Sequence, residues 1–421
     1  MFEDPGVLNL FPLTRTRTAC QLRAGRRTLL EMIADALETT GVVVHCRPEL
    51  ADVVREDTTR PVNRIAEGLD VLFINGRTIV HTSDVLGPVI EATRGQTPTV
   101  FVSEGQLVAA WAPASTVPAG RVAEPLIDAD SFGDFVVTEL PDAKLATRIW
   151  DLLDHIDACV SADFATLSHG INIYERPGTQ ISERALLVNG EQIFTAAGVQ
   201  VRAGAVLDAS RGPIIIDRDA VIMENVVLHG PVSIGEKSIV KVGASLELCV
   251  VGPRCKVAGE VHDSVMHSYS NKSHAGFLGN SYLGSWVNLG ADTNTSNLKN
   301  DYGIVSAYNE SLGAMEKTGS MFAGLVMGDH SKCGISSMFN TGTVIGVSCN
   351  LFGSGYYPRY VPSFLWGGSE GGFVPYRLEK AMEVAEVVMK RRDRTLTPAM
   401  RDLLSFVHSE TESDRQRGTV R

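Results

Sequence analysis

One large aliphatic residue recurs every six positions through the middle of this 421-residue chain. An α-helix needs a period of 3.6 residues and an ordinary strand a period of two, so neither produces this pattern. A parallel β-helix with three short strands per turn does, because each strand sends one aliphatic side chain into a shared interior. The first run comprises Ile216, Ile222, Leu228, Ile234, Val240 and Leu246.

A second run at the same period follows further along the chain. The repeat fades over residues 251–277, which predicts a loop or an irregular coil, and a long excursion interrupts it at 290–320. We therefore predict a left-handed parallel β-helix of the hexapeptide-repeat kind over residues 196–365. A β-sandwich with similarly spaced turns is the alternative. The second run comprises Met327, Cys333, Phe339, Ile345 and Leu351.

The flanking segments have other patterns. Residues 1–140 alternate short apolar runs with helical stretches, which predicts a small α/β domain with a hairpin turn at Asn75-Gly76. Residues 141–195 predict a linker helix and a lead-in to the coil. Residues 366–421 predict helices that cap its open end, followed by a frayed tail.

Composition excludes several classes of partner. The formal net charge of -11 argues against nucleic acid and anionic membranes. No apolar run approaches the roughly 20 residues that span a bilayer, and the first residues lack a secretory pattern. The seven cysteines form no CxxC pair and no Cys/His cluster with zinc spacing, so we expect no metal site and reduced thiols in a cytoplasmic protein.

The segment 272–297 carries the most informative residues. It contains Lys-Ser-His-Ala-Gly-Phe-Leu-Gly, then Leu-Gly-Ser-Trp-Val-Asn-Leu-Gly-Ala-Asp-Thr, then Asn-Leu. It resembles the acetyltransferase half of bifunctional uridylyltransferase/glucosamine-1-phosphate acetyltransferases (GlmU-type), with the pattern K-x-x-H-L-x-Y-L-G-D-x-x-I-G-x-x-V-N-I-G-A-G-T-x-x-x-N-Y. The whole chain is similar to GlmU-like sugar nucleotidyl transferases, which share an opening like LNLFPLTRTR and a segment like GDHSKCGISSMFNTGTVIG.

The resemblance implies an acyl-CoA-dependent transferase, with acetyl-CoA the expected donor and a sugar phosphate or nucleotide sugar as acceptor. His274 matches the catalytic base, and Asn288 and Asn297 match residues that hold the sugar and orient the base or amine. The backbone N–H near Ala291 matches a contact with the thioester. An imidazole suits proton removal near pH 7. The alternatives are a surface histidine in a loop and asparagines that form a ladder or a turn.

Several positions depart from the family pattern. Phe277 replaces a tyrosine, and His262, in the segment that begins at Glu260, replaces a phosphate-binding lysine. We therefore include Glu260 and His262 among the substrate-binding candidates, with Lys272 and Lys299 as substitutes for the missing lysine.

Two further features have open interpretations. Asp329 and His330 predict either part of a groove for the acyl donor or a turn ladder. Trp286 predicts a stacking surface for a sugar or a contact between subunits. The resemblance also implies a homotrimer with active sites between neighbouring copies.

The N-terminal part keeps only the Pro-Leu-Thr end (12–14) of the phosphate-cradling loop of nucleotidyltransferases, with Gly6 the one glycine nearby. Five arginines follow, and a solvated basic face is the interpretation we favour for them. Asp70 and Asp84 are candidate magnesium ligands, needed only if this part is catalytic. We therefore predict a degenerate nucleotidyltransferase-like domain. The arginines are Arg15, Arg17, Arg23, Arg26 and Arg27.

Three functions remain open from the sequence. The first is acyl transfer by the coil, and the second is nucleotidyl transfer to a sugar-1-phosphate by the N-terminal domain. The third is a non-catalytic scaffold that binds sugar nucleotides. The missing glycine-rich loop argues against the second, and the ungapped match around His274 argues against the third.

Overall fold

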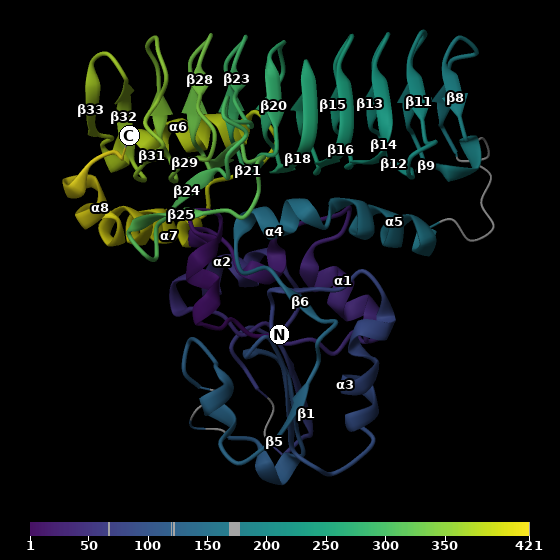
Figure 1. Ribbon diagram of the computed structural model, residues 1–421, viewed down its shortest axis with the longest axis vertical. Helices are drawn as coiled ribbons and strands as arrows, with labels where there is room; N and C mark the ends of the chain where they lie inside the picture. The colour runs from purple at the N-terminus through teal and green to yellow at the C-terminus, as the bar shows by residue number, and fades with distance from the viewer. Residues whose placement is uncertain (66–67, 119, 121–122, 168–176, 421) are drawn as a thin grey trace. The chain divides into compact units, whose positions relative to one another are not determined.

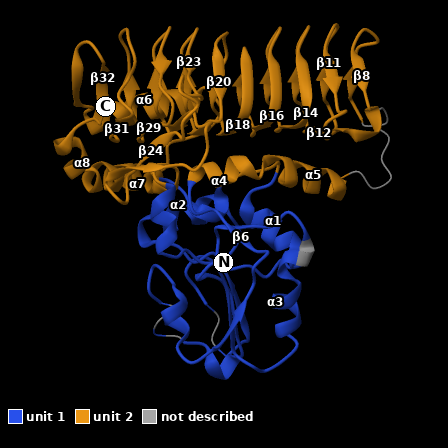
Figure 2. Cartoon of the chain, viewed as in Figure 1, with its two compact units in different colours: residues 1–10, 16–22, 27–148 blue, residues 11–15, 23–26, 149–421 orange. Residues whose placement is uncertain are grey.

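Three stacked columns of short parallel strands make up the region with the six-residue repeat (Figure 1). The computed structural model describes residues 1–65, 68–118, 120, 123–167 and 177–420. The chain forms two units, coloured separately in Figure 2. Residues 1–10, 16–22 and 27–148 form the first, and residues 11–15, 23–26 and 149–421 form the second.

Each turn of the coil contributes one strand to each of three faces. Face 1 contains β7 (Gln180–Ile181), β10 (Gln200–Val201), β13 (Val221–Ile222), β15 (Ile239–Val240), β17 (Lys256–Val257), β19 (Asn271–Lys272), β22 (Asn288–Leu289), β27 (Lys332–Cys333), β30 (Asn350–Leu351), β32 (Leu365–Gly368) and the antiparallel β33 (Gly372–Pro375).

Faces 2 and 3 share three long strands that bend at a corner. These are β14 (Val227–Ile234), β16 (Ser245–Val251) and β18 (Glu260–Ser268). Their first halves join face 2 with β8 (Leu186–Val188), β11 (Val206–Asp208) and β20 (Phe277–Gly279), which β23 (Asn294–Thr295) and β28 (Met338–Phe339) continue. Their second halves join face 3 with β9 (Ile193–Thr195), β12 (Ile214–Ile216), β21 (Tyr282–Ser285), β26 (Leu325–Met327), β29 (Thr343–Ile345) and β31 (Tyr360–Val361).

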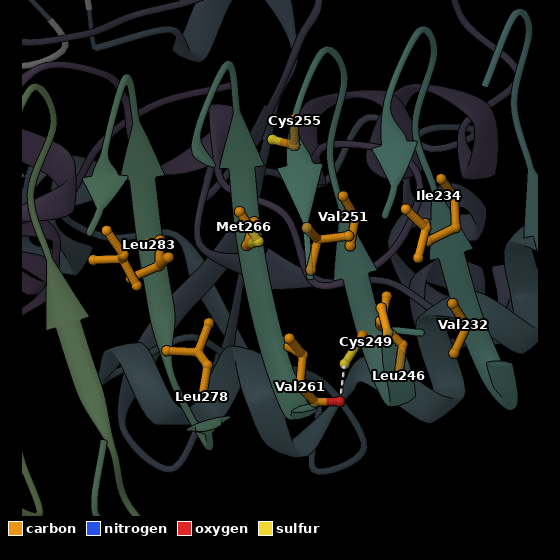
Figure 3. Close-up of a cluster of buried hydrophobic side chains, with 14 of the residues drawn as sticks. Val232, Ile234, Leu246, Cys249, Val251, Cys255, Val261, Met266, Leu278 and Leu283 are labelled. Atoms are coloured by element: carbon orange, nitrogen blue, oxygen red, sulfur yellow. Dashed lines mark hydrogen bonds between the residues drawn. The ribbon is translucent and has the colours of Figure 1, made fainter. Parts of the chain in front are cut away.

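The aliphatic repeat fills the interior of this coil. Leu228, Leu246, Val261 and Leu278 are partners in register and are at most 1% exposed. Figure 3 shows several of these side chains stacked between the strands. Burying each such side chain stabilises the fold by about 1.5–3 kcal/mol, so the column as a whole contributes strongly to the stability of the coil. The predicted fold class, an α/β part, a hexapeptide-repeat parallel β-helix and C-terminal helices, is confirmed.

The coil continues without a loop where the repeat fades. Leu246 pairs in register with Val261, 15 residues on, whereas Leu228 pairs with Leu246, 18 residues on. Shorter corners therefore shift the period while the interior column persists. The expectation of a loop at 251–277 is wrong, and that of an irregular coil is right.

The limits of the coil also differ from the predicted ones. Strands β7, β8 and β9 pair in parallel with the next turn, so the coil begins near residue 180 and not at 196. The excursion leaves after Thr295 and returns at Leu325. It carries the antiparallel hairpin β24 (Ser306–Asn309) and β25 (Ala314–Lys317).

The C-terminal segment lies along the coil instead of capping its end. Helix α6 (Leu378–Lys390) is followed by Arg392, which donates hydrogen bonds to the carbonyl of Arg254 and to Asn271 Oδ1 in the middle turns. Helices α7 (Pro398–Glu410) and α8 (Glu412–Arg417) come next. Val420 then pairs with Tyr360 at the edge of face 3, so the tail is ordered and not frayed. Strand β33, not a helix, covers the edge of face 1.

The remaining helices of the second unit, α4 (Ile149–Asp154) and α5 (Ile156–Leu167), pack on the long strands of the coil. In the first unit, β1 (Val71–Ile74), β4 (Gln106–Ala112), β3 (Thr99–Ser103) and β5 (Val136–Glu139) form a mixed sheet, and β2 (Thr78–Ile79) pairs with β6 (Lys144–Leu145). Its helices are α1 (Leu29–Ala36), α2 (Ala51–Asp57) and α3 (Gly87–Ala92).

The predicted hairpin at Asn75-Gly76 is wrong, because β1 and β2 pair with different strands. Asn75 is buried, and its side chain donates to the carbonyl of Leu107. The hairpin of this sheet instead joins β3 and β4 through Glu104-Gly105, both of which have positive φ, as a type I′ turn requires. All seven cysteines are free and buried, as expected.

Candidate functional site

His274 lies at the corner between faces 1 and 2. The corner spans residues 273–276, between β19 and β20, and the imidazole is exposed to solvent. The backbone carbonyl of His274 accepts a hydrogen bond of 3.1 Å from Lys272 Nζ. The same ammonium donates to the carbonyl of Ala258 in the preceding turn, at 3.2 Å. Lys272 therefore fixes the corner that presents the histidine.

Lys272 occupies an interior position that is aliphatic in the turns before and after it. It stands in register between Val257 and Leu289 and is 1% exposed. Burial lowers the pKa of this lysine to about 8, with a partial opposing effect from the carboxylate of Asp292. The amine lies inside the coil, so it does not meet the expectation of a lysine that reaches a substrate phosphate.

The buried lysine predicts a pH dependence of stability. The folded-state pKa is about 8 against 10.5 for an ordinary lysine, so between these values the unfolded state binds more protons and stability rises with pH. The stability of Lys272→Met relative to the unsubstituted chain should therefore fall from pH 8 to pH 10, by at most about 1.4 kcal/mol per pH unit. Urea unfolding of both proteins at several pH values measures this difference.

Lys241→Met serves as the control for this comparison, since Lys241 is a partly exposed lysine of the same unit. A stability difference for Lys272→Met that stays constant from pH 7 to pH 10 would contradict the placement of this amine in the interior.

A row of acidic and histidine side chains runs along face 2. Asp208, His229, Glu247, His262 and Gly279 occupy equivalent positions in successive turns. His229 Nδ1 lies 3.7 Å from a carboxylate oxygen of Asp208, and His262 Nε2 lies 3.9 Å from one of Glu247. In the sequence, His229 precedes Glu247 by 18 residues, whereas His262 follows it by 15. A search at one fixed spacing therefore misses this row.

His262 is the best partnered histidine of this row. Besides Glu247, the carboxylate of Asp263 lies 3.5 Å from its Nδ1. Arg211 holds Glu247 from the other side at 2.6 Å. Carboxylates on both sides therefore fix the orientation of this imidazole on face 2.

Phe277 and Asn297 lie beside this histidine. The ring centroids of Phe277 and His262 are 6.3 Å apart. Asn297 Nδ2 donates to Asn280 Oδ1 at 2.8 Å, and a Cβ on Gly279 would meet both Phe277 and Asn297. Glu260, exposed, is the register partner of Phe277. The structure thus brings together Glu260, His262, Phe277 and Asn297.

Asn288 lies on a different face from Asn297. It is exposed on face 1, where its Oδ1 accepts a hydrogen bond from Asn271 at 3.4 Å. Each side of the coil takes about six residues, so two positions nine residues apart cannot share a side. Asn288 and Asn297 therefore do not lie on the same face of one chain.

The other two candidates, Lys299 for the acceptor and Ala291 for the thioester, lie outside the cluster around His262. Lys299 lies in the excursion, where its amine pairs with Asp301 at 3.1 Å. Ala291 lies in the turn that follows β22, and its carbonyl accepts a hydrogen bond from the Ser336 N–H at 2.7 Å.

Asp329 and His330 belong to a packed corner and not to an open groove. Each is 4% exposed, and Asp329 Oδ1 accepts the Ser285 N–H at 2.8 Å. The His330 ring stacks on Trp286, which stacks on Tyr269 with centroids 4.2 Å apart. Trp286 is itself only 8% exposed. The turn-ladder alternative is right, and the expectations of a donor groove and of an exposed sugar-stacking ring are not met.

The N-terminal segment does not carry a solvated basic face. Arg15 and Arg17 are buried, at 6% and 7% exposure. Gly6 packs against the guanidinium of Arg77, which forms a buried ion pair with Asp4. The space beside Gly6 is therefore filled by Arg77. The loop around Gly6 does not form the phosphate-binding cradle that nucleotidyltransferases have.

No metal site is evident among the described residues. They contain no group of three or more His, Cys, Asp or Glu side chains that could hold an ion. Asp70 accepts a hydrogen bond from the Ala114 N–H, and the side chain of Asp84 lies outside what the structure describes. The residues present do not fit magnesium. Within the described part of the chain, no helix has the length and apolar character to cross a membrane.

Comparison with known families gives a match for the N-terminal part. Residues 1–172 match the sugar nucleotidyl transferase family. This match agrees with the resemblance seen in the sequence, and it confirms the expectation of a transferase at the level of the family.

Among solved structures, the chain is similar to a UDP-N-acetylglucosamine acyltransferase, at 12% identity over 55% of this chain and 87% of that one, with a TM-score of 0.24. Two others are the Francisella novicida enzyme of the same name (14% identity, 53% and 74% coverage, TM-score 0.18) and the Arabidopsis one (13% identity, 52% and 78% coverage, TM-score 0.20).

Proposed function

We propose that the β-helix transfers an acyl group, acetyl in the first instance, from acyl-CoA to a sugar phosphate or nucleotide sugar. The observation that carries this proposal is the exposed imidazole of His274 on a corner fixed by Lys272, in the same turn as Phe277 and one turn after His262. Acyl transfer needs a base that removes the acceptor's proton and donors that stabilise the developing oxyanion, and in this proposal His274 supplies the base.

In this mechanism His274 accepts the proton of the acceptor amine or hydroxyl as that group attacks the thioester carbonyl. The thiol of CoA then leaves with a proton. His262, held between Glu247 and Asp263, contacts the acceptor from face 2. Asn297 uses one amide hydrogen to bind Asn280 Oδ1. Its carbonyl oxygen and its second amide hydrogen then orient the sugar.

The place of Asn288 on face 1 supports assembly of the complete site between copies of the chain. Its side chain is exposed on the outside of the coil, so it can complete only a site built by a neighbour. We propose a homotrimer in which face 1 of one copy lies beside face 2 of the next.

Nucleotidyl transfer by the N-terminal part is the second candidate. The family match over residues 1–172 favours it. Two observations argue against it. Arg77 fills the space beside Gly6, and the described residues contain no group of three or more His, Cys, Asp or Glu side chains that could hold a magnesium ion.

Incubation of the full chain with labelled acetyl-CoA and a panel of amino-sugar phosphates and nucleotide sugars tests the first proposal. We expect label in at least one acceptor, and its absence across the panel would count against acetyl transfer. A parallel assay for pyrophosphate released from nucleoside triphosphates with sugar-1-phosphates tests the second candidate.

A further inference from the structure

A separate cavity of about 600 Å³ lies at the C-terminal end of the coil. Its walls come from the ends of β32 and β33, from the segment before β31 and from the residues after α8, elements that meet at one end of the coil in Figure 1. The volume falls in the range of small-molecule sites, which is about 300–1,000 Å³. The side chains that line this cavity include Asn340, Tyr356, Arg359, Phe373 and Arg415.

Neither arginine of this cavity forms an ion pair within the described part of the chain, although Glu412 and Asp414 act on Arg415 from a longer distance. Arg359 uses one terminal nitrogen to donate to the carbonyl and hydroxyl of Thr341, and its Nε is buried with no hydrogen-bond partner. Arg415 donates only to neutral oxygens, of Ser363, His408 and Thr411. Burial lowers the pKa of Arg415, with Glu412 and Asp414 opposing that effect.

Two unpaired guanidinium groups beside a cavity are unusual in a chain of net charge -11. A buried arginine elsewhere in this unit, Arg15, has three carboxylates around it. Arg359 and Arg415 are partly exposed, and Arg359 Nε is buried without a hydrogen-bond partner, so both guanidinium groups are available to an anion from outside the chain. The lining that the structure describes contains no Asp or Glu that could take this place.

We propose that this cavity binds a phosphorylated small molecule, with the phosphate on Arg359 and Arg415 and the organic part against Tyr356 and Phe373. The planar guanidinium fork matches phosphate oxygens in pairs, and aromatic side chains offer an apolar wall for a planar group. The cavity has room for more than an inorganic ion. This inference does not depend on the activity proposed for the coil.

Isothermal titration calorimetry of the full chain with ADP, pyrophosphate and adenosine tests the proposal. We expect ADP to bind more tightly than pyrophosphate, and adenosine to bind at least about tenfold more weakly than ADP, because each charge-assisted hydrogen bond contributes strongly. Binding of ADP should weaken as salt concentration rises. Equal affinity for adenosine and ADP, or no binding of ADP, would overturn the proposal.

Arg359→Gln should weaken ADP binding about tenfold or more. Arg202→Gln, an exposed arginine in an early turn of the coil, is the matched control and should leave binding unchanged. Arg415→Gln would remove hydrogen bonds to three other residues and so disturb the C-terminal tail. The Arg359 variant is therefore the test of the proposal, with a thermal melt to show that it is folded. Unchanged ADP affinity in folded Arg359→Gln would place the ligand elsewhere and refute the assignment.

Discussion

His274→Ala is expected to reduce acyl transfer by about 10²–10⁴-fold, the usual contribution of a positioned general base. The imidazole is exposed on its corner, so its removal leaves the interior column intact and should barely change the thermal melt. The measurement is the initial rate of label transfer from acetyl-CoA to the best acceptor of the panel, together with a melting curve.

His229→Ala is the matched control for this prediction. His229 also lies on the outside of the coil, in an earlier turn of face 2, next to Asp208. Its loss should leave turnover unchanged. Full activity in His274→Ala would remove this residue from the mechanism, whereas equal losses in both variants would point to a general effect on the coil.

The second large effect is expected at the buried charges around Arg15. Its Nε lies 2.7 Å from Glu310 in the excursion hairpin, and one terminal nitrogen lies 2.8 Å from Glu410 at the end of α7. The guanidinium also stacks over Phe11, 4.0 Å from the ring centroid. One arginine thus holds three segments of the second unit that are distant in sequence.

Arg15→Met should destabilise the protein by about 3–5 kcal/mol, because it leaves the carboxylate of Glu310 buried without its cation. Burial already raises the pKa of Glu310, and Arg15 opposes that rise. Without the arginine, protonation of Glu310 becomes easier, so the deficit should shrink as the pH falls toward 5. Urea unfolding at pH 7 and pH 5 measures both effects.

The double variant Arg15→Met with Glu310→Leu separates the charge effect from lost packing. It should recover much of the stability, because no unpaired charge then remains in the interior. A double variant as unstable as Arg15→Met alone would show that packing against Phe11, and not the ion pair, dominates.

The sequence by itself determined the β-helix, since a strict period of six has only one simple structural explanation. It also indicated the polar stretch around His274, through the resemblance of that stretch to the acetyltransferase pattern. It did not show that Lys272 points inward, because a lysine at an interior position looks in the sequence like any polar residue of a turn.

Only the tertiary structure decided which of these residues share a face. The turns differ in length by several residues, so equal spacing in the sequence does not place side chains at equivalent positions of the coil. The pairing of Arg15 with Glu310 was equally hidden, because a contact across almost 300 residues depends on packing and leaves no local pattern in the sequence.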